Sequence, residues 1–182
     1  MANILSKEEI IKQLTTASND VQTYCSNINN ELFFYPPADK WSIAQNIEHL
    51  IIAAKSTIPA YNLPKFIVRL YAGKTNRPSR TYDELVAKYQ LKLANGGKAG
   101  GRFVPNQSAA GKRKEKLLQQ LSSVMNKLSI TIQQKWNDSQ LDNYIAPHPL
   151  LGKITLRELG YFTIYHTYHH LAIIKERTIL AH

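Results

Sequence analysis

Residues 41–50 read WSIAQNIEHL and carry the signals that decide the fold. Ser42 stands three residues before Gln45, which is the spacing of a capping box, in which two side chains bond the free backbone N–H groups of a helix start. The apolar residues that follow recur at intervals of three and four, as on one face of an α-helix. We therefore predict a helix from residue 43 to about 61, ending before Pro64, because proline interrupts helical hydrogen bonding.

The same start signal occurs three more times, as Ser6/Glu9, Thr81/Glu84 and Thr155/Glu158. Apolar residues at helical spacing follow each pair, and the pattern also returns after residue 112. We predict four long helices, over about 7–32, 43–61, 112–136 and 156–180, with shorter helical pieces at 65–71 and near 82–93. No segment shows the period-two alternation of a half-buried strand. The sequence thus predicts an all-α fold, a four-helix bundle.

Size and composition indicate one domain that spans residues 1–182. The chain has 182 residues, of which 43% are hydrophobic, enough for an ordinary core. Charged residues interrupt its apolar runs well short of the roughly 20 residues that cross a membrane, so we expect no transmembrane helix. The first residues include acids where a signal peptide has an apolar core, and Cys25 has no cysteine to pair with. We expect a cytoplasmic protein.

The net charge of +10 is concentrated in one region. Residues 74–116 hold eleven Lys and Arg against three acids, a net charge of +8. Six of the eight glycines lie between 73 and 111. We interpret 74–111 as a flexible basic connection between the second and third long helices, with a solvated surface. The alternative is a surface that binds an anionic partner such as nucleic acid.

Histidines are the residues with the clearest chemical pattern. His166 and His170 stand four apart on the last predicted helix, so their side chains share a face and could bind one metal. A helical wheel does not separate His169 from His170. His49 flanks the apolar stripe of its helix, which places it beside a crevice. Spacing alone leaves open the other interpretation, a structural cluster of hydrogen-bonded histidines.

A family resemblance extends this pattern. Residues 41–50 resemble the tryptophan-to-His-Leu signature of the DinB/YfiT-like superfamily, and 148–159 with the three later histidines are similar to its proline-glycine turn and closing H-x-x-H-H helix. The resemblance implies a bundle of DinB/YfiT type and a divalent metal (Zn, Ni or Fe) bound by His49, His166 and His170. His169 would then be a neighbour. It is also compatible with a homodimer, and the uses it implies include S-transferases and isomerases that employ low-molecular-weight thiols.

The functional hypothesis is a metal-dependent enzyme for a small molecule, an S-transferase that uses a small thiol or a related hydrolase. Three neutral imidazoles leave a divalent metal an open position, which is typical of catalytic sites. No residue is assigned a catalytic role. We interpret Cys25 as a buried structural thiol, and His148, Tyr165 and Tyr168 as packing or surface residues. The competing hypothesis is a non-enzymatic protein that binds an anion through residues 74–116; we rank it lower because no recognised nucleic-acid motif accompanies the charge.

Overall fold

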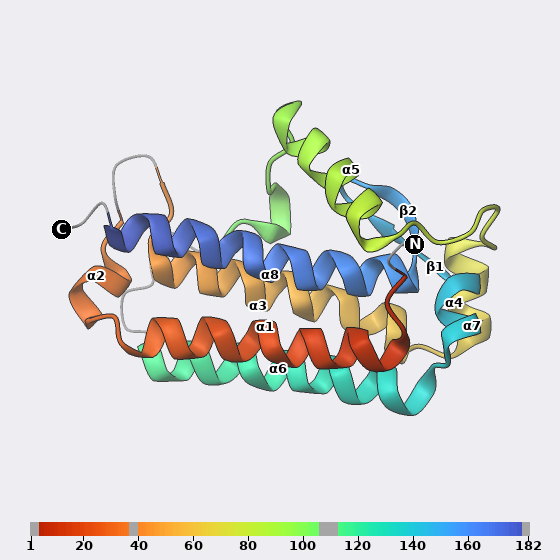
Figure 1. The fold of residues 1–182 in the computed structure, drawn as a ribbon, viewed down its shortest axis with the longest axis horizontal. Helices are drawn as coiled ribbons and strands as arrows, with labels where there is room; N and C mark the ends of the chain where they lie inside the picture. The colour runs from red at the N-terminus through yellow and green to blue at the C-terminus, as the bar shows by residue number, and fades with distance from the viewer. Residues whose placement is uncertain (1–3, 37–39, 106–112, 180–182) are drawn as a thin grey trace.

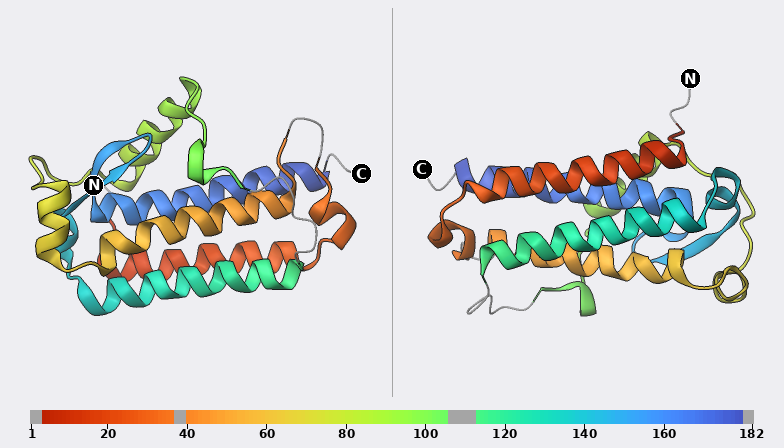
Figure 2. Two further views of the ribbon diagram at one scale, coloured as in Figure 1. Left: turned by 180° about the vertical axis from the view of Figure 1, so that it is seen from behind. Right: turned by 90° about the horizontal axis from the view of Figure 1, so that it is seen from below.

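Four long helices form the body of the protein, as a computed structural model describes it for residues 4–36, 40–105 and 113–179 (Figure 1). They are α1 (Lys7–Ser26), α3 (Ile43–Asn62), α6 (Lys114–Lys135) and α8 (Leu156–Ile179). Both α1 and α3 pack against α6 and against α8, so α1 lies diagonally across the bundle from α3 (Figure 2). The predicted all-α four-helix bundle is confirmed.

The direction of the helices explains why one connection is long. The helix α3 ends at the end of the bundle opposite to the start of α6, so these two neighbours run parallel (Figure 1). A helix of 20 residues such as α3 is about 30 Å long, and the chain must cover that length again before α6 begins. Residues 63–113 make this return. The turn from α6 into α8 needs no such crossing, because α8 starts at the end where α6 stops.

The returning connection contains α4 (Lys65–Ala72), α5 (Tyr82–Ala94) and a single 3₁₀ turn, η1 (Gly101–Phe103). The helix α5 packs on α8, and η1 packs on α3. The helical piece expected near 82–93 is therefore confirmed. Residues 106–111 of the segment expected to be flexible lie outside the described residues, and the flexibility of 74–111 stays a prediction.

One buried carboxylate fastens the start of this connection to the bundle. Glu158 on α8 has no exposed side-chain surface, and its two oxygens accept hydrogen bonds from the guanidinium of Arg77 at 2.6 and 2.7 Å. The backbone N–H of Arg80 donates to it at 2.7 Å, and that of Thr155 at 3.0 Å. Part of the predicted basic surface is thus bound internally rather than solvated.

The predicted helix starts agree with the structure. Ser6, Ser42 and Thr81 each close a capping box with the residue three positions later. Thr155 and Glu158 also bond each other's backbone N–H groups, at 3.0 and 3.1 Å. These reciprocal bonds satisfy donors that a helix start otherwise leaves free.

Several short elements were not expected. The first helix ends at Ser26 rather than near residue 32, because the side chain of Asn29 caps a separate helix, α2 (Asn30–Phe34). After α6 come α7 (Asp138–Asn143) and an antiparallel hairpin of β1 (Ile145–His148) and β2 (Gly152–Thr155). These strands carry no recognisable sequence pattern because each has only four residues, and β1 contains a proline.

The core lies between the four long helices, and two of its large aromatic side chains bond to main-chain carbonyls. The buried Tyr61 donates its hydroxyl hydrogen to the carbonyl of Leu156 at 2.6 Å, and the indole N–H of Trp136 donates to the carbonyl of Tyr61 at 2.8 Å. The expected burial of Cys25 is confirmed, and burial raises the pKa of its thiol to about 12. No helix in the described ranges is long and apolar enough to cross a membrane.

Candidate metal centre

The structure brings His49 of α3 together with His166 and His170 of α8. Their ring centroids lie 4.7 to 4.9 Å apart, and one ring nitrogen from each lies within 4.8 Å of the others. The Nε2 atoms of His49 and His166 are 3.1 Å apart. Two nitrogens bound to one zinc ion in tetrahedral geometry are separated by about 3.3 Å. Within the described residues this is the one cluster of His, Cys, Asp or Glu with the proximity a metal requires.

The protonation of His49 follows from its neighbour in the connection. Its Nδ1 lies 2.7 Å from the backbone carbonyl oxygen of Phe103 in η1. A carbonyl only accepts hydrogen bonds, so Nδ1 carries the proton. The Nε2 of a neutral His49 therefore has a free lone pair, and it is the atom that faces His166.

His170 is fixed in the same way by a side chain of α3. Its Nδ1 lies 2.7 Å from Oδ1 of Asn46. The amide nitrogen of Asn46 donates to the carbonyl of Ser42 at 2.8 Å, which fixes the orientation of the amide and makes Oδ1 the acceptor. His170 thus also holds its proton on Nδ1 and keeps Nε2 free. Such hydrogen bonds orient histidine ligands in metal sites and raise their basicity.

Burial keeps the cluster neutral. It lowers the pKa of His49, and it lowers the pKa of His166 and of His170 well below the ordinary value, with smaller contributions from the neighbouring histidines. All three side chains have 5 or 6% of their surface exposed. The neutral form is the one that binds metals, so the cluster is ready to act as a ligand set at pH 7.

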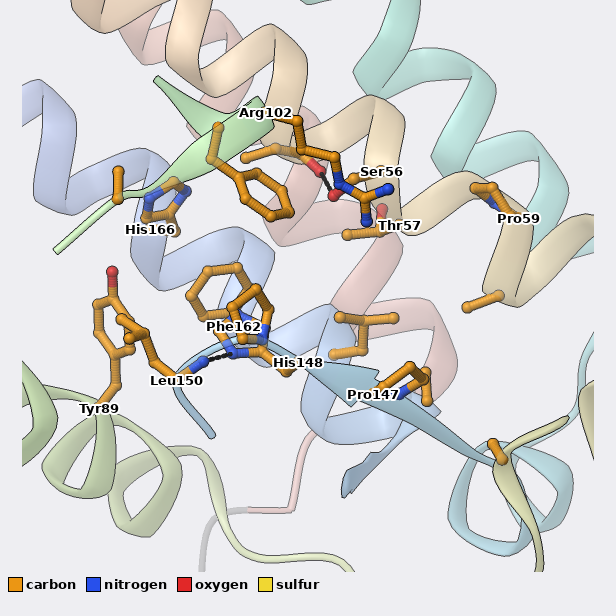
Figure 3. Close-up of a pocket in the computed structure, with 18 of the residues that line it drawn as sticks. Ser56, Thr57, Pro59, Tyr89, Arg102, Pro147, His148, Leu150, Phe162 and His166 are labelled. Carbon is orange, nitrogen blue, oxygen red and sulfur yellow. Dashed lines mark hydrogen bonds between the residues drawn. The ribbon is translucent and has the colours of Figure 1, made fainter. Parts of the chain in front are cut away.

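A cavity of about 620 Å³ opens beside the histidines (Figure 3). His49 and His166 contribute to its lining, and α3, α4, α5, η1, β1 and α8 form its walls. Most of the lining is apolar, including Phe162, whose ring stacks on His166 at 4.9 Å. Lys98 and Arg102 supply positive charge, and no Asp or Glu is among the described lining residues.

A scan against protein families matches residues 13–174 to the DinB superfamily. The chain belongs to the DinB superfamily. Among solved structures, this DinB protein is similar to YfiT from Bacillus subtilis, described as a probable metal-dependent hydrolase with an unusual four-helix bundle topology. The similarity has a TM-score of 0.57 at 17% identity and covers 96% of this chain and 87% of YfiT, which shows a shared fold. No curated protein matches the chain.

In this DinB bundle the structure separates His170 from His169, which the sequence could not do. His170 faces His49 and Asn46, whereas His169 lies beside the cluster and stacks on Tyr165 at 6.1 Å. Tyr165 and Tyr168 are held at their hydroxyls by Gln90 and Asp20, which agrees with packing roles.

Three participants were not expected from the sequence. His148 lines the cavity, although it was interpreted as a packing or surface residue. Asn46 could have been found, because it lies one turn before His49 on the same helix face. Phe103 could not, because its contribution is a backbone carbonyl, which any residue type provides.

Proposed function

We propose that the protein is a metal-dependent enzyme that acts on a small molecule, either as a hydrolase or as an S-transferase that uses a low-molecular-weight thiol. Membership of the DinB superfamily and the similarity to YfiT support this proposal. The ligands in the proposal are His49, His166 and His170, and the metal is a divalent ion such as Zn, Ni or Fe, all of which accept imidazole.

The observation that carries the proposal is the hydrogen bonding behind the histidines. Phe103 and Asn46 accept hydrogen bonds from Nδ1 of His49 and of His170, so Nε2 is the unprotonated nitrogen of both neutral rings, and Nε2 of His49 lies 3.1 Å from Nε2 of His166. The three residues therefore fit a divalent cation without a change of backbone, and the donor set is neutral.

The chain's own residues supply binding and exclusion of water around this centre. A divalent metal held by three histidines lowers the pKa of a bound water or thiol and polarises a carbonyl oxygen. Trp41 packs against His49 and His170, with ring centroids 5.0 and 6.3 Å away, while Phe162 covers His166. These aromatic rings limit the approach of water to the ligands, so that substrate arrives through the cavity.

The lining of the cavity indicates the kind of substrate. Its walls are mainly apolar, and its charged side chains, Lys98 and Arg102, are both positive. The guanidinium of Arg102 lies 5.1 Å from the ring centre of Phe103, whose carbonyl binds His49. We infer a substrate with an apolar body and an anionic group.

Metal analysis tests the ligand assignment. Purified protein without a metal-binding tag should contain about one equivalent of Zn, Ni or Fe, measured by elemental analysis. His49→Ala, His166→Ala and His170→Ala should each lose it while circular dichroism shows unchanged helicity. His169→Ala, which removes a histidine from the same helix but outside the cluster, is the matched control and should retain the metal. Full metal content in any of the three ligand variants would contradict the assignment.

Turnover measurements separate the two reaction classes. The metal-loaded protein is incubated with small esters, amides and electrophiles, with and without an added thiol. Product formation that requires the thiol indicates an S-transferase, and product formation with water alone indicates a hydrolase. The matched control is His49→Ala, which should form product neither with the thiol nor with water alone.

Binding of an anionic polymer through residues 74–116 receives less support. Arg77 and Arg80 pair with Glu158, and the ammonium of Lys114 donates to the carbonyls of Ser26 and Ile28. Tyr89, one of the aromatic residues considered for stacking on bases, has 6% of its surface exposed and lines the cavity. Absence of nucleic-acid binding at low salt, where phosphate contacts are strongest, is the expected result.

A cytoplasmic location, expected from the single cysteine, and a homodimer, with which the family resemblance is compatible, remain part of the proposal. Light scattering coupled to gel filtration measures the oligomeric state, and a monomer would contradict the dimer.

A further inference from the structure

His148 occupies the end of β1, where the hairpin turns, and its ring is fixed by that turn. Its Nδ1 accepts a hydrogen bond from the backbone N–H of Leu150 at 3.2 Å (Figure 3) and a second from that of Leu151 at 3.1 Å. An atom that accepts two N–H bonds has no room for a proton of its own. Neutral His148 must therefore carry its proton on Nε2.

This Nε2–H group has no protein partner within the described residues, although His148 contributes to the lining of the cavity. Phe162 packs against the ring of His148, with centroids 4.1 Å apart, and on its other side stacks on His166. One aromatic ring thus lies between the metal cluster and His148, and both border the same space. The turn leaves a single hydrogen-bond donor available to whatever enters the cavity.

The state of this donor is constant at neutral pH. Burial lowers the pKa of His148 to about 4, so the ring is uncharged at pH 7. A neutral imidazole donates a hydrogen bond and keeps its proton, because its deprotonation to imidazolate requires a pH far above neutral. Donors that are already oriented, and that need no reorganisation, are the groups that stabilise negative charge on a substrate oxygen most effectively.

We propose that His148 is a substrate-binding residue whose Nε2–H donates to the oxygen that carries or gains negative charge during the reaction. The role of this bond in a reaction rests on the proposed function. The tautomer of His148 and its available Nε2–H donor follow from the hydrogen bonds of the turn alone. The proposal assigns the hairpin, whose Ala146, Leu151 and Ile154 pack in the core, a further role in the site.

Two substitutions separate the two nitrogens of the ring. In His148→Asn the side-chain oxygen takes the place of Nδ1 and can still accept from the turn, as asparagine does in Asx turns, while the far donor is lost. In His148→Gln the amide N–H₂ lies near the position of Nε2, while the acceptor for the turn is lost. His169→Asn, a histidine that does not line the cavity, is the matched control.

The probe is hexanoate, which offers a carboxylate acceptor and an apolar chain. The side chains of ¹⁵N-labelled histidine are observed by NMR, in protein with and without zinc, during titration with hexanoate. We expect His148 to show the Nε2–H tautomer before any addition, and its Nε2 signal to shift on binding. His148→Asn should unfold at the wild-type temperature yet bind hexanoate roughly tenfold or more weakly. His148→Gln should bind better than His148→Asn but unfold at a lower temperature.

Three results would overturn the proposal: a proton on Nδ1 of His148, an Nε2 signal that hexanoate leaves unmoved, or wild-type affinity in His148→Asn. Failure of the protein to bind zinc is a different result. That result contradicts the proposed function. The role of His148 is then tested by its tautomer and by hexanoate titration of the metal-free protein.

Discussion

Asn46 shows how much of the candidate metal centre depends on a residue that does not touch the metal. It accepts from Nδ1 of His170 and is itself oriented by the carbonyl of Ser42. Because Asn46 and His49 lie on one face of α3, one helix carries both a proposed ligand and the partner of another proposed ligand. Loss of such a partner typically weakens metal binding without abolishing it.

We predict that Asn46→Ala binds zinc roughly 10- to 100-fold more weakly than the wild type, because His170 then rotates and loses the bond that fixes its tautomer. Competition with a chelator of known zinc affinity measures the change. Asn30→Ala, at an exposed position of α2, is the matched control and should bind as the wild type does. Equal affinity in Asn46→Ala would mean that His170 is not a ligand or needs no orientation.

For single residues, the sequence predicts those that act through a distinctive side chain. It misses those that act through a backbone group or only through their position in three dimensions. The spacing of His166 and His170 indicated a shared face, and His49 was placed beside a crevice. The choice between His169 and His170 depends on where α3 lies against α8, which a helical wheel does not contain. The carbonyl of Phe103 leaves no mark in the sequence, because every residue has one.

The contacts between Glu158 and the connection matter at the scale of elements, because they hold the start of α5 against α8. Arg77 and Arg80 retain 29 and 27% side-chain exposure, whereas the carboxylate is fully buried. Burial alone raises the pKa of Glu158, but the hydrogen bonds from Arg77 and from the backbone N–H groups of Arg80 and Thr155 outweigh it, and the net pKa lies below the ordinary 4.5.

We predict that Glu158→Gln lowers the free energy of unfolding by about 2–4 kcal/mol at pH 7, since it leaves two arginines without their carboxylate. The sign with pH follows from the lowered pKa. The contribution of Glu158 is complete above the unfolded-state pKa and is lost as pH falls through the folded-state pKa, so the difference between variant and wild type shrinks below about pH 4. Guanidinium unfolding across this range measures it.

The control for this series is Glu31→Gln, which removes an exposed carboxylate from α2. It should unfold as the wild type does at pH 7. A Glu158→Gln protein of wild-type stability would show that the connection is held by its apolar contacts and not by the ion pairs.

Elements were predictable where a local signal marks them. Each of the four capping boxes marks a real helix start, because the bonds lie within four consecutive residues. The hairpin was missed because its stability comes from packing on α8 and α4. A strand of four residues is too short for this packing to appear as a sequence pattern. The end of α1 was misplaced because an apolar stripe continues past Ser26 into α2 while the backbone changes direction.

The whole molecule carries several neutral buried histidines, which makes its stability sensitive to acid. Burial lowers the pKa of His148 to about 4 and shifts His49, His166 and His170 in the same direction. In the unfolded chain each returns to about 6.5. The unfolded state therefore binds more protons between pH 7 and pH 5, and stability falls as pH falls.

For metal-free protein we predict a loss of about 2 kcal/mol between pH 7 and pH 5 from His148 alone, with further losses from the three histidines of the cluster. Chemical unfolding at both pH values measures the total. His166→Phe removes one group that takes up a proton on unfolding, so its stability should depend less steeply on pH. Equal stability of the wild type at pH 7 and pH 5 would contradict the burial of these rings in the neutral form.

The bond from Phe103 to His49 has a consequence for how sequences of this kind can diverge. The acceptor is a main-chain oxygen, so substitution at position 103 leaves it in place as long as η1 keeps its conformation. The side chains of the same turn, Arg102 and Phe103, meanwhile form part of the cavity wall. Substitutions in this turn therefore alter the shape and charge of the cavity wall while the hydrogen bond that orients His49 stays in place.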